Sequence, residues 1–297
     1  MKINRPFFEI WLQEPGINGI YRQVERAGRV CYKSEDHASE DSARPFAERM
    51  IKSHHTAMLE HATVYLKKKV DTRGEAASCF SKVNIVDGIA YITTNLRVLV
   101  ENGWMDDLNY ICEPTDHHEK RVTVHFTTQI SITREFNRHR VNSMAEQSTR
   151  YCNYSKDKFG SEVTINLPKW VHDLPDGDWS SDVEKGSVDI DGNSFLELAR
   201  KVVDGEADDM ENWLFANLAA ERSYMNLISS GHTAQEARAI LPLDTNTELV
   251  HTAFVSDWLH FFDLRALGTT GAPHPDAKVL ALPLMEEFQK LGLIPEN

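Results

Sequence analysis

The sequence predicts a helix-rich α+β fold with a small antiparallel sheet, in a single domain that spans residues 1–297. Two stretches, 62–70 and 122–130, carry the β-branched residues and partial alternation that are typical of strands. Between them, residues 83–92 predict a hairpin, because Asp-Gly is a preferred two-residue turn between apolar strands. The longest helical pattern covers residues 195–230. This mixture, in which most of the pattern is helical, indicates the α+β class.

Further helices are predicted on both sides of this region. Residues 42–53 should begin at Asp41 or Ser42 as N-cap, and residues 95–101 should stop near Gly103. The 195–230 pattern is interrupted near Gly205. A last helix should hold Pro275 in its first turn and be kinked or broken at Pro283. The other predicted helices cover 20–30, 132–140, 233–240 and 254–267, and a surface loop covers 173–193.

The composition limits the classes of function. The chain of 297 residues has a formal net charge of -13, which argues against a broad contact with nucleic acid or a membrane surface. Its four cysteines form no CxxC pair, so neither a zinc ribbon nor a disulfide framework is indicated. No signal peptide and no bilayer-spanning apolar run is recognised. A cytoplasmic protein without a nucleic-acid or membrane partner is therefore expected.

One basic run, residues 138–150, departs from the acidic composition. It begins with Arg138-His139-Arg140 and ends at Arg150. A planar guanidinium can meet two phosphate oxygens at once, and hydroxyl and backbone donors can add neutral hydrogen bonds. Alone, an Arg-His-Arg sequence would more often be a solvated helix end. Together with Glu146, Ser148 and Arg150 it predicts a site for a small anionic ligand, in particular a nucleotide.

The same run carries a resemblance to a known family. Arg138-His139-Arg140, seven further residues and then Ser148-Thr149-Arg150 resemble the signature of the flavin-dependent thymidylate synthases. The resemblance covers most of the chain and implies a fold like that of the thymidylate synthase-complementing proteins. Residues of about 72–118, a probable insertion, and the acidic loop after Trp170 match least. The other matching segments, in chain order, are 29–32, 54–61, 237–242 and 260–265.

The resemblance implies an enzyme that methylates dUMP to dTMP. Arg150 and Arg238 would hold the phosphate, and Ser148 would assist them. Arg265 would lie by the uracil and stabilise the negative charge that develops when a hydride adds to the ring. The implied catalytic residues are thus Arg265 and Ser148. The implied substrate-binding residues are Glu135, Arg138, Glu146, Gln147, Ser148, Thr149, Arg150, Arg238 and Arg265.

The resemblance also implies FAD as cofactor, with NADPH and methylenetetrahydrofolate as co-substrates, in a homotetramer whose active sites each draw on more than one subunit. Because reduced flavin does the difficult chemistry, no cysteine nucleophile is required. Phe254 and Ser256 stand where the family usually has Asn and Arg, and Ala57 replaces a hydroxyl residue, so the flavin side matches less well. The implied FAD-binding residues are Cys31, His55, Glu60, Arg138, His139, Arg140, His260 and His274.

Several alternatives remain at this point. His54, His55 and His61 could be metal ligands, but their spacing matches no zinc motif, and no metal is predicted. His117 and His118 are expected to be ordinary surface or hydrogen-bonded residues. The aromatic stripe Trp258, Phe261 and Phe262 is expected to be helix core rather than a flavin box. A flavin-dependent hydroxymethylase of a pyrimidine nucleotide and a non-catalytic nucleotide-binding homologue are the alternative functions.

Overall fold

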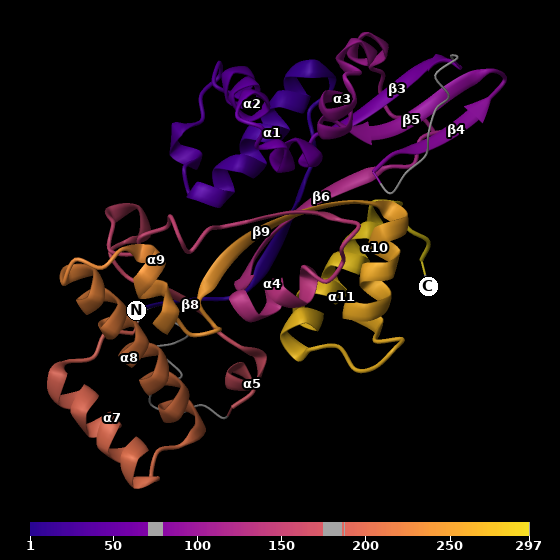
Figure 1. Cartoon of the computed structure of the whole chain (residues 1–297). Helices are drawn as coiled ribbons and strands as arrows, with labels where there is room; N and C mark the ends of the chain where they lie inside the picture. Colours follow the sequence, from indigo (N-terminus) through magenta and orange to yellow (C-terminus); the bar gives the residue numbers. More distant parts are fainter. Residues whose placement is uncertain (71–79, 175–185, 187, 297) are drawn as a thin grey trace.

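The computed structural model describes residues 1–70, 80–174, 186 and 188–296. A four-stranded antiparallel sheet runs through its middle in the order β2-β6-β9-β7 (Figure 1). These strands are β2 (Phe7–Trp11), β6 (Arg121–Gln129), β7 (Ser143–Glu146) and β9 (Asn246–Phe254). A three-stranded antiparallel sheet contains β3 (Thr63–Lys69), β5 (Ile89–Asn95) and β4 (Lys82–Val86). A parallel pair joins β1 (Lys2–Asn4) to β8 (Thr164–Asn166).

Helices surround these sheets on three sides, so the predicted helix-rich α+β class is confirmed (Figure 1). Short 3-10 segments and one π-helical turn, Asp263–Leu267, link several of them. The α-helices are α1 (Gly16–Tyr32), α2 (Ala43–Lys52), α3 (Leu96–Asn102), α4 (Ile130–Phe136), α5 (Lys169–His172), α7 (Gly192–Asp204), α8 (Asp209–Ser229), α9 (Ala234–Ala237), α10 (Val255–Phe262) and α11 (Pro275–Lys290).

The three-stranded sheet packs with α1, α2 and α3 around one hydrophobic cluster. Its predicted hairpin is confirmed: Asp87 and Gly88 have φ of 50° and 74°, as a two-residue turn with both central residues left-handed requires. The short helix after it is also confirmed. The side chain of Asn95 accepts a hydrogen bond from the backbone N–H of Val98 and caps α3, and Gly103 ends it in the left-handed conformation.

The central sheet packs its apolar face on α10 and α11. Val124 and Phe126 of β6 meet Trp258, Phe261 and Phe262, all buried, so the prediction that the aromatic stripe is helix core is confirmed. The predicted break at Pro283 is wrong, because α11 continues to Lys290. Pro283 lies on the exposed side of α11. The opposite side of the helix is buried in the core, and this packing stabilises the helix across the proline. The buried residues around it are Leu280, Ala281, Leu284, Met285 and Phe288.

A further prediction is corrected by the structure, because the helix predicted for 132–140 ends at Phe136. Strand β9 was not predicted, although it is the strand between β6 and β7. Its burial is almost continuous, so it lacks the alternation by which a strand is recognised. The predicted interruption near Gly205 is confirmed, because this residue caps α7 with φ of 74°.

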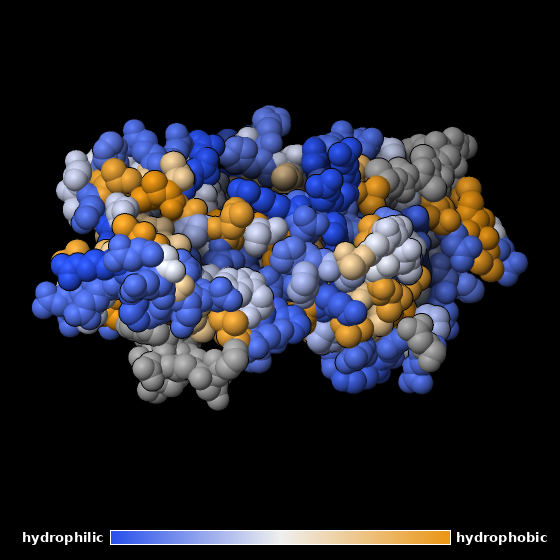
Figure 2. All heavy atoms as spheres, turned by 90° about the horizontal axis from the view of Figure 1, so that it is seen from below, coloured by the Kyte–Doolittle hydropathy of each residue, from blue (hydrophilic) through white to orange (hydrophobic). Residues whose placement is uncertain are grey.

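Most of the predicted loop 173–193 and the start of the segment 72–118 lie outside the described residues. The described part of the latter contributes β4 and β5 to the three-stranded sheet, and it also contains α3. No described helix combines the length and apolar character needed to cross a bilayer. Hydrophilic residues cover most of the face seen from below, with hydrophobic residues in small separate groups (Figure 2).

Candidate functional site

The basic run leaves the end of α4, makes a turn and enters β7. His139 is buried in this turn, because its N–H bonds the carbonyl of Phe136 at 3.1 Å and its carbonyl accepts from Asn142 at 3.1 Å. The flanking Arg138 and Arg140 are exposed, and neither has an ion pair or hydrogen bond within the described chain. The turn therefore holds the imidazole inside and both guanidinium groups outside.

Beyond β7, the chain borders a cleft of about 860 Å³. This cleft brings together substrate residues that the sequence predicted from two distant segments, 146–149 and 238. It also contains Arg134 and Gln235, which had not been predicted as site residues. The lining residues are Ile130, Arg134, Glu146, Gln147, Ser148, Thr149, Gln235, Arg238, Ala239, Leu241, Pro242 and Leu243.

Two arginines are held at this cleft by neutral side chains. Arg238 donates from Nη1 to Oγ1 of Thr149 at 3.0 Å, and Arg150 donates from Nε to Oε1 of Gln235 at 2.9 Å. The N–H of Arg150 also donates to Oγ of Ser148 at 3.3 Å. No carboxylate of the described residues forms an ion pair with either guanidinium. Both positive charges remain available to an anionic ligand, in contrast to ordinary surface ion pairs.

The carboxylate of Glu146 is fixed at the inner wall of the cleft. Oγ1 of Thr133 donates to it at 2.7 Å and Nδ2 of Asn137 at 3.1 Å. Both donors come from α4 or its end, so the early end of this helix places Asn137 against Glu146. An anionic carboxylate held in this way can accept a hydrogen bond from a ligand N–H but repels a ligand anion.

A second cavity, of about 530 Å³, lies next to the first and includes the predicted flavin residues Cys31 and His55. The rings of Tyr32 and Tyr151 lie 5.4 Å apart at its wall. The backbone N–H of Ser148 donates to the carbonyl of Cys31 at 2.9 Å, so the segment 148–151 separates the two cavities. Arg97 also lines the second cavity and forms an ion pair with Glu60.

Cys31 is not equipped to act as a nucleophile. Burial, with the neighbouring Cys152 and Glu146, raises the pKa of its thiol to about 11. The thiol is therefore protonated near neutral pH, and its sulfur lies 3.8 Å from that of Met58. Cys152 is buried and Cys112 partly buried, whereas Cys79 lies outside the described residues.

The predicted catalytic Arg265 does not line either cavity. It donates from Nη1 to Oε2 of Glu135 at 2.7 Å, from Nη2 to the carbonyl of Glu135 at 2.6 Å, and from Nε to Nε2 of His139 at 3.3 Å. Burial, the Arg265 cation and His260 lower the pKa of His139 to about 4, so the ring is neutral and accepts this hydrogen bond. The ring of His260 lies 5.7 Å from that of His139.

The predicted residues thus form three groups on one chain. The cleft residues and the flavin-side residues adjoin through the segment 148–151, while the Arg265 group lies apart from both cavities. Arg134 and Glu135 are neighbours in α4, yet Arg134 lines the cleft and Glu135 binds Arg265. His274 is the N-cap of α11, because its Nδ1 accepts from the N–H of Asp276 at 3.2 Å.

Gln235 is one of the two polar residues of this cleft, with Arg134, that sequence reasoning missed. A signal was present: Thr233 and Glu236 form a capping box, which starts α9 and turns the side chain of Gln235 toward the cleft wall. The same short helix leads directly to Arg238. Because α9 starts so close to the predicted phosphate-binding Arg238, the first turn of this helix could have been predicted to contribute a site residue.

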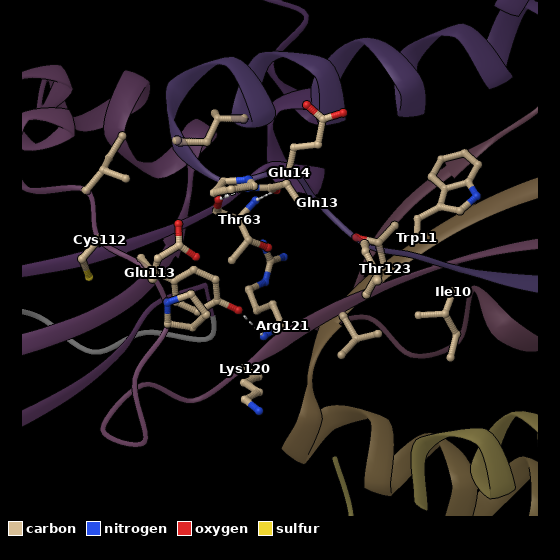
Figure 3. A pocket seen from close by; sticks show the side chains of 18 of the residues that line it. Ile10, Trp11, Gln13, Glu14, Thr63, Cys112, Glu113, Lys120, Arg121 and Thr123 are labelled. Atoms are coloured by element: carbon tan, nitrogen blue, oxygen red, sulfur yellow. Dashed lines mark hydrogen bonds between the residues drawn. The ribbon is translucent and has the colours of Figure 1, made fainter. Parts of the chain in front are cut away.

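A third cavity, of about 350 Å³, contains none of the predicted residues. Figure 3 shows Arg121 at its centre, close to Thr63 and Thr123. The guanidinium of Arg121 donates to the carbonyl of Glu60 at 2.9 Å and to Oγ of Ser143 at 3.2 Å. The guanidinium of Arg121 therefore already forms hydrogen bonds within the fold at this cavity.

The histidines of the described chain do not gather into a metal centre, since no group of three or more His, Cys, Asp or Glu side chains there has a suitable arrangement. His61 is buried and its Nδ1 lies 2.9 Å from Oγ1 of Thr252. His118 is buried against the carbonyl of Leu66 at 3.1 Å, which confirms its expected hydrogen-bonded role.

Residues 114–292, more than half of the chain, match the family model described as thymidylate synthase complementing protein. The chain belongs to this family. The segment that matches the thymidylate synthase complementing proteins includes the whole cleft, the basic run and the Arg265 group, but not the flavin-side residues before 114. The recognition made from the basic run is therefore confirmed.

Two solved structures are similar to this thymidylate synthase complementing protein. Both are of the UMP/dUMP methylase PolB from Streptomyces cacaoi. The one bound with 5-Br dUMP is 18% identical, with a TM-score of 0.42, and the match covers 98% of this chain and 93% of that chain. The one bound with 5-Br UMP is 16% identical, with a TM-score of 0.43, covering 98% and 92%. No curated protein sequence matches the chain.

Proposed function

We propose that this protein methylates dUMP to dTMP, with methylenetetrahydrofolate as carbon donor and reduced FAD, supplied with electrons by NADPH, as hydride carrier. The observation that carries the proposal is the pair Arg150 and Arg238. Arg238 lines the cleft and Arg150 is hydrogen-bonded to Gln235 of its lining, both inside the family-matched segment, and neither forms an ion pair with a carboxylate of the described residues. A nucleotide phosphate is the anion that suits two such guanidinium groups beside a serine hydroxyl.

The remaining cleft residues support a nucleotide rather than a free phosphate. Glu146 is held as a hydrogen-bond acceptor by Thr133 and Asn137, which suits a ligand N–H or hydroxyl group. Arg134, an exposed residue of the cleft lining, adds a further positive charge. We assign the phosphate to the Arg150 and Arg238 side and the nucleoside to the Glu146 side.

The residues of the second cavity fit a flavin. Tyr32 and Tyr151 offer aromatic faces for a planar ring, and Arg97 and His55 offer donors for its oxygen atoms. When bound, FAD would supply the hydride. Cys31, Tyr32, His55 and Tyr151 would position it, with the segment 148–151 between it and the nucleotide. Phe254 is buried and Ser256 hydrogen-bonds Glu119, so neither offers the amide or guanidinium donor usual at these positions in the family.

The position of Arg265 supports the proposed homotetramer. On a single chain Arg265 is hydrogen-bonded to Glu135 and His139 and lies outside both cavities. For Arg265 to stabilise charge on a uracil ring, its group must meet a nucleotide cleft supplied by another subunit. Mixing inactive Arg265→Ala and Arg150→Ala proteins under conditions that exchange subunits should then restore some activity. No restoration would contradict shared sites.

The test of the proposed function is the mass of the nucleotide product. Purified protein is incubated anaerobically with dUMP, methylenetetrahydrofolate, FAD and NADPH. A methylated product that depends on added FAD is expected. A hydroxymethylated product would assign the protein to hydroxymethylation of a pyrimidine nucleotide instead. Unchanged dUMP from colourless protein that binds dUMP but not FAD would contradict the proposed activity and favour a non-catalytic nucleotide-binding homologue.

A further inference from the structure

The central sheet has a polar face as well as an apolar one. Glu9 of β2, His125 and Thr127 of β6, and Asn246 and Glu248 of β9 project from the face opposite the α10 and α11 core. They floor a cavity of about 500 Å³, which we call the sheet cavity. Its walls come from the end of α1, from β1 and β8 and from the segment 147–162. Those wall residues are Lys2, Asn4, Lys33, Gln147, Tyr154, Lys158, Phe159, Gly160, Glu162 and Thr164.

Three side chains of the sheet cavity are more than nine-tenths buried and each has a polar atom without a hydrogen-bond partner. These atoms are Nδ1 of His125, Oε1 of Gln147 and the hydroxyl of Tyr154. The nearest carboxylate to Nδ1 of His125 is Glu9, 3.7 Å away. An unsatisfied buried polar group costs about 1–3 kcal/mol, and three such atoms belong to residues that line this one cavity. Such groups are typical of a site that recognises a polar ligand.

The charges at the sheet cavity favour an anion. Two of its three carboxylates have a cation within 4 Å: Glu248 pairs with Lys33, and Glu162 lies 3.4 Å from the amino group of Met1. Lys158 and Lys2, in contrast, pair with no carboxylate of the described chain. Lys158 donates to the backbone carbonyls of Tyr32 and Lys33 at 3.1 and 3.0 Å, and Lys2 is exposed at the rim.

We propose that the sheet cavity is a second ligand site, which binds a small organic dianion bearing carboxylate or phosphate groups. Lys2 and Lys158 supply the charge, and Tyr154, Gln147 and His125 supply the hydrogen bonds. Gln147 lines both this cavity and the nucleotide cleft, so the two sites are adjacent and share this residue. The site does not depend on the proposed methylation of dUMP.

The experiment is calorimetric titration of the full-length protein with glutarate and with ribose 5-phosphate, two dianions that distinguish a carboxylate from a phosphate ligand. Tyr154→Phe removes the unpartnered hydroxyl and keeps the ring, and Lys2→Gln removes a rim charge from a side chain without bonds. Each variant should weaken binding of the recognised probe by about tenfold or more, the effect of one hydrogen bond or charge contact to an ion. Arg238→Ala, in the neighbouring cleft, is the matched control.

Binding of either probe that falls in Tyr154→Phe and Lys2→Gln and persists in Arg238→Ala would support the sheet cavity. Binding of glutarate alone would show that the sheet cavity recognises carboxylates. Binding of ribose 5-phosphate alone would show that it recognises a phosphate ester. Binding that falls only in Arg238→Ala would place the anion in the nucleotide cleft and overturn the proposal. So would an absence of binding by both probes at millimolar concentration. Since Tyr154→Phe removes a buried hydroxyl that has no hydrogen-bond partner, its melting temperature should not fall and is expected to rise.

Discussion

At the scale of single residues, this protein uses neutral side chains to hold charged ones. Thr149 and Gln235 orient Arg238 and Arg150 without neutralising them. A carboxylate in either place would hold the arginine equally well but would compete with a phosphate for its charge. The positive charge at the cleft therefore depends on the neutral side chains of Thr149 and Gln235, which orient the two arginines without pairing with their charge.

Removal of Arg150 tests the phosphate assignment. Arg150→Ala should weaken dUMP binding by about 1.5–3 kcal/mol, the range for a hydrogen bond to a charged group. Gln235→Ala should weaken it less, because the guanidinium stays but loses the acceptor that orients it. Calorimetry measures both affinities, with Arg200→Ala, an exposed arginine of α7, as control. Unchanged affinity in Arg150→Ala would remove the phosphate from this position.

Arg265 is expected to act on turnover rather than on cofactor binding. Arg265→Ala should lower kcat by about tenfold or more, because a fixed cation near developing charge is lost. The fraction of protein with bound FAD, read from its absorbance, should change little. His139 would lose a donor in the same variant, so His139→Gln serves as the comparison. Loss of FAD with normal turnover in the bound fraction would contradict the assigned role.

At the scale of elements, the end of a helix could be predicted from the sequence where a capping residue marks it, and not where tertiary packing ends the helix. Asn95 and Gly103 bound α3 as predicted, because capping needs only a few neighbouring residues. The early end of α4 at Phe136 had no comparable signal. It follows from tertiary packing, which buries His139 and brings Asn137 to Glu146.

Pro283 offers a test at this scale. A proline inside a helix has no N–H, so the carbonyl four residues earlier lacks its usual partner. Since Pro283 is exposed, Pro283→Ala restores the hydrogen bond without disturbing the core. The free energy of unfolding should rise by about 1–2 kcal/mol, after the gain in unfolded-chain entropy is subtracted. Chemical denaturation measures it, with the buried Leu284→Ala as a destabilising control. A lower stability of Pro283→Ala would contradict this account.

At the scale of the whole molecule, buried neutral histidines connect the central sheet with its neighbours. Burial, with the nearby Arg121, lowers the pKa of His61 to about 3, and burial also lowers the pKa of His251 well below its ordinary value. His61 binds Thr252 and His251 stacks on Trp258 at 4.2 Å. The folded state therefore excludes protons that the unfolded chain would bind.

The stability of the folded state is expected to decrease at acidic pH. Above pH 6.5, roughly the pKa of an unfolded histidine, these groups are neutral in both states and their full contribution is present. As the pH falls below 6.5 toward about 3 for His61 and 4 for His139, only the unfolded chain gains protons, so stability decreases. The slope is up to about 1.4 kcal/mol per pH unit for each histidine.

Melting temperatures between pH 7.5 and 5 measure this effect. We expect a progressive fall, with a smaller slope in His61→Gln, whose side chain keeps a polar group for Thr252 but does not titrate. The exposed His37→Gln is the control and should keep the slope of the original protein. A melting temperature that is constant over this range would contradict the neutral state of the buried histidines.

The sequence by itself determined the fold class, the hairpin at Asp87-Gly88, and the family, which the basic run from Arg138 to Arg150 identified. Each of these depends on residues close together in the chain, whose turn, capping or motif chemistry is local. Much of the candidate site was also within reach, because the motif contains Ser148 and Thr149.

Only the tertiary structure decided how these parts meet. It brought Arg238 to Thr149 and Gln235 to Arg150 across more than 80 residues, and it took Arg265 away from the cleft to Glu135. It also placed β9 inside the sheet, where continuous burial hides the pattern of a strand. Contacts between distant residues depend on how whole elements bury their apolar faces, and no local pattern of residue types specifies that arrangement.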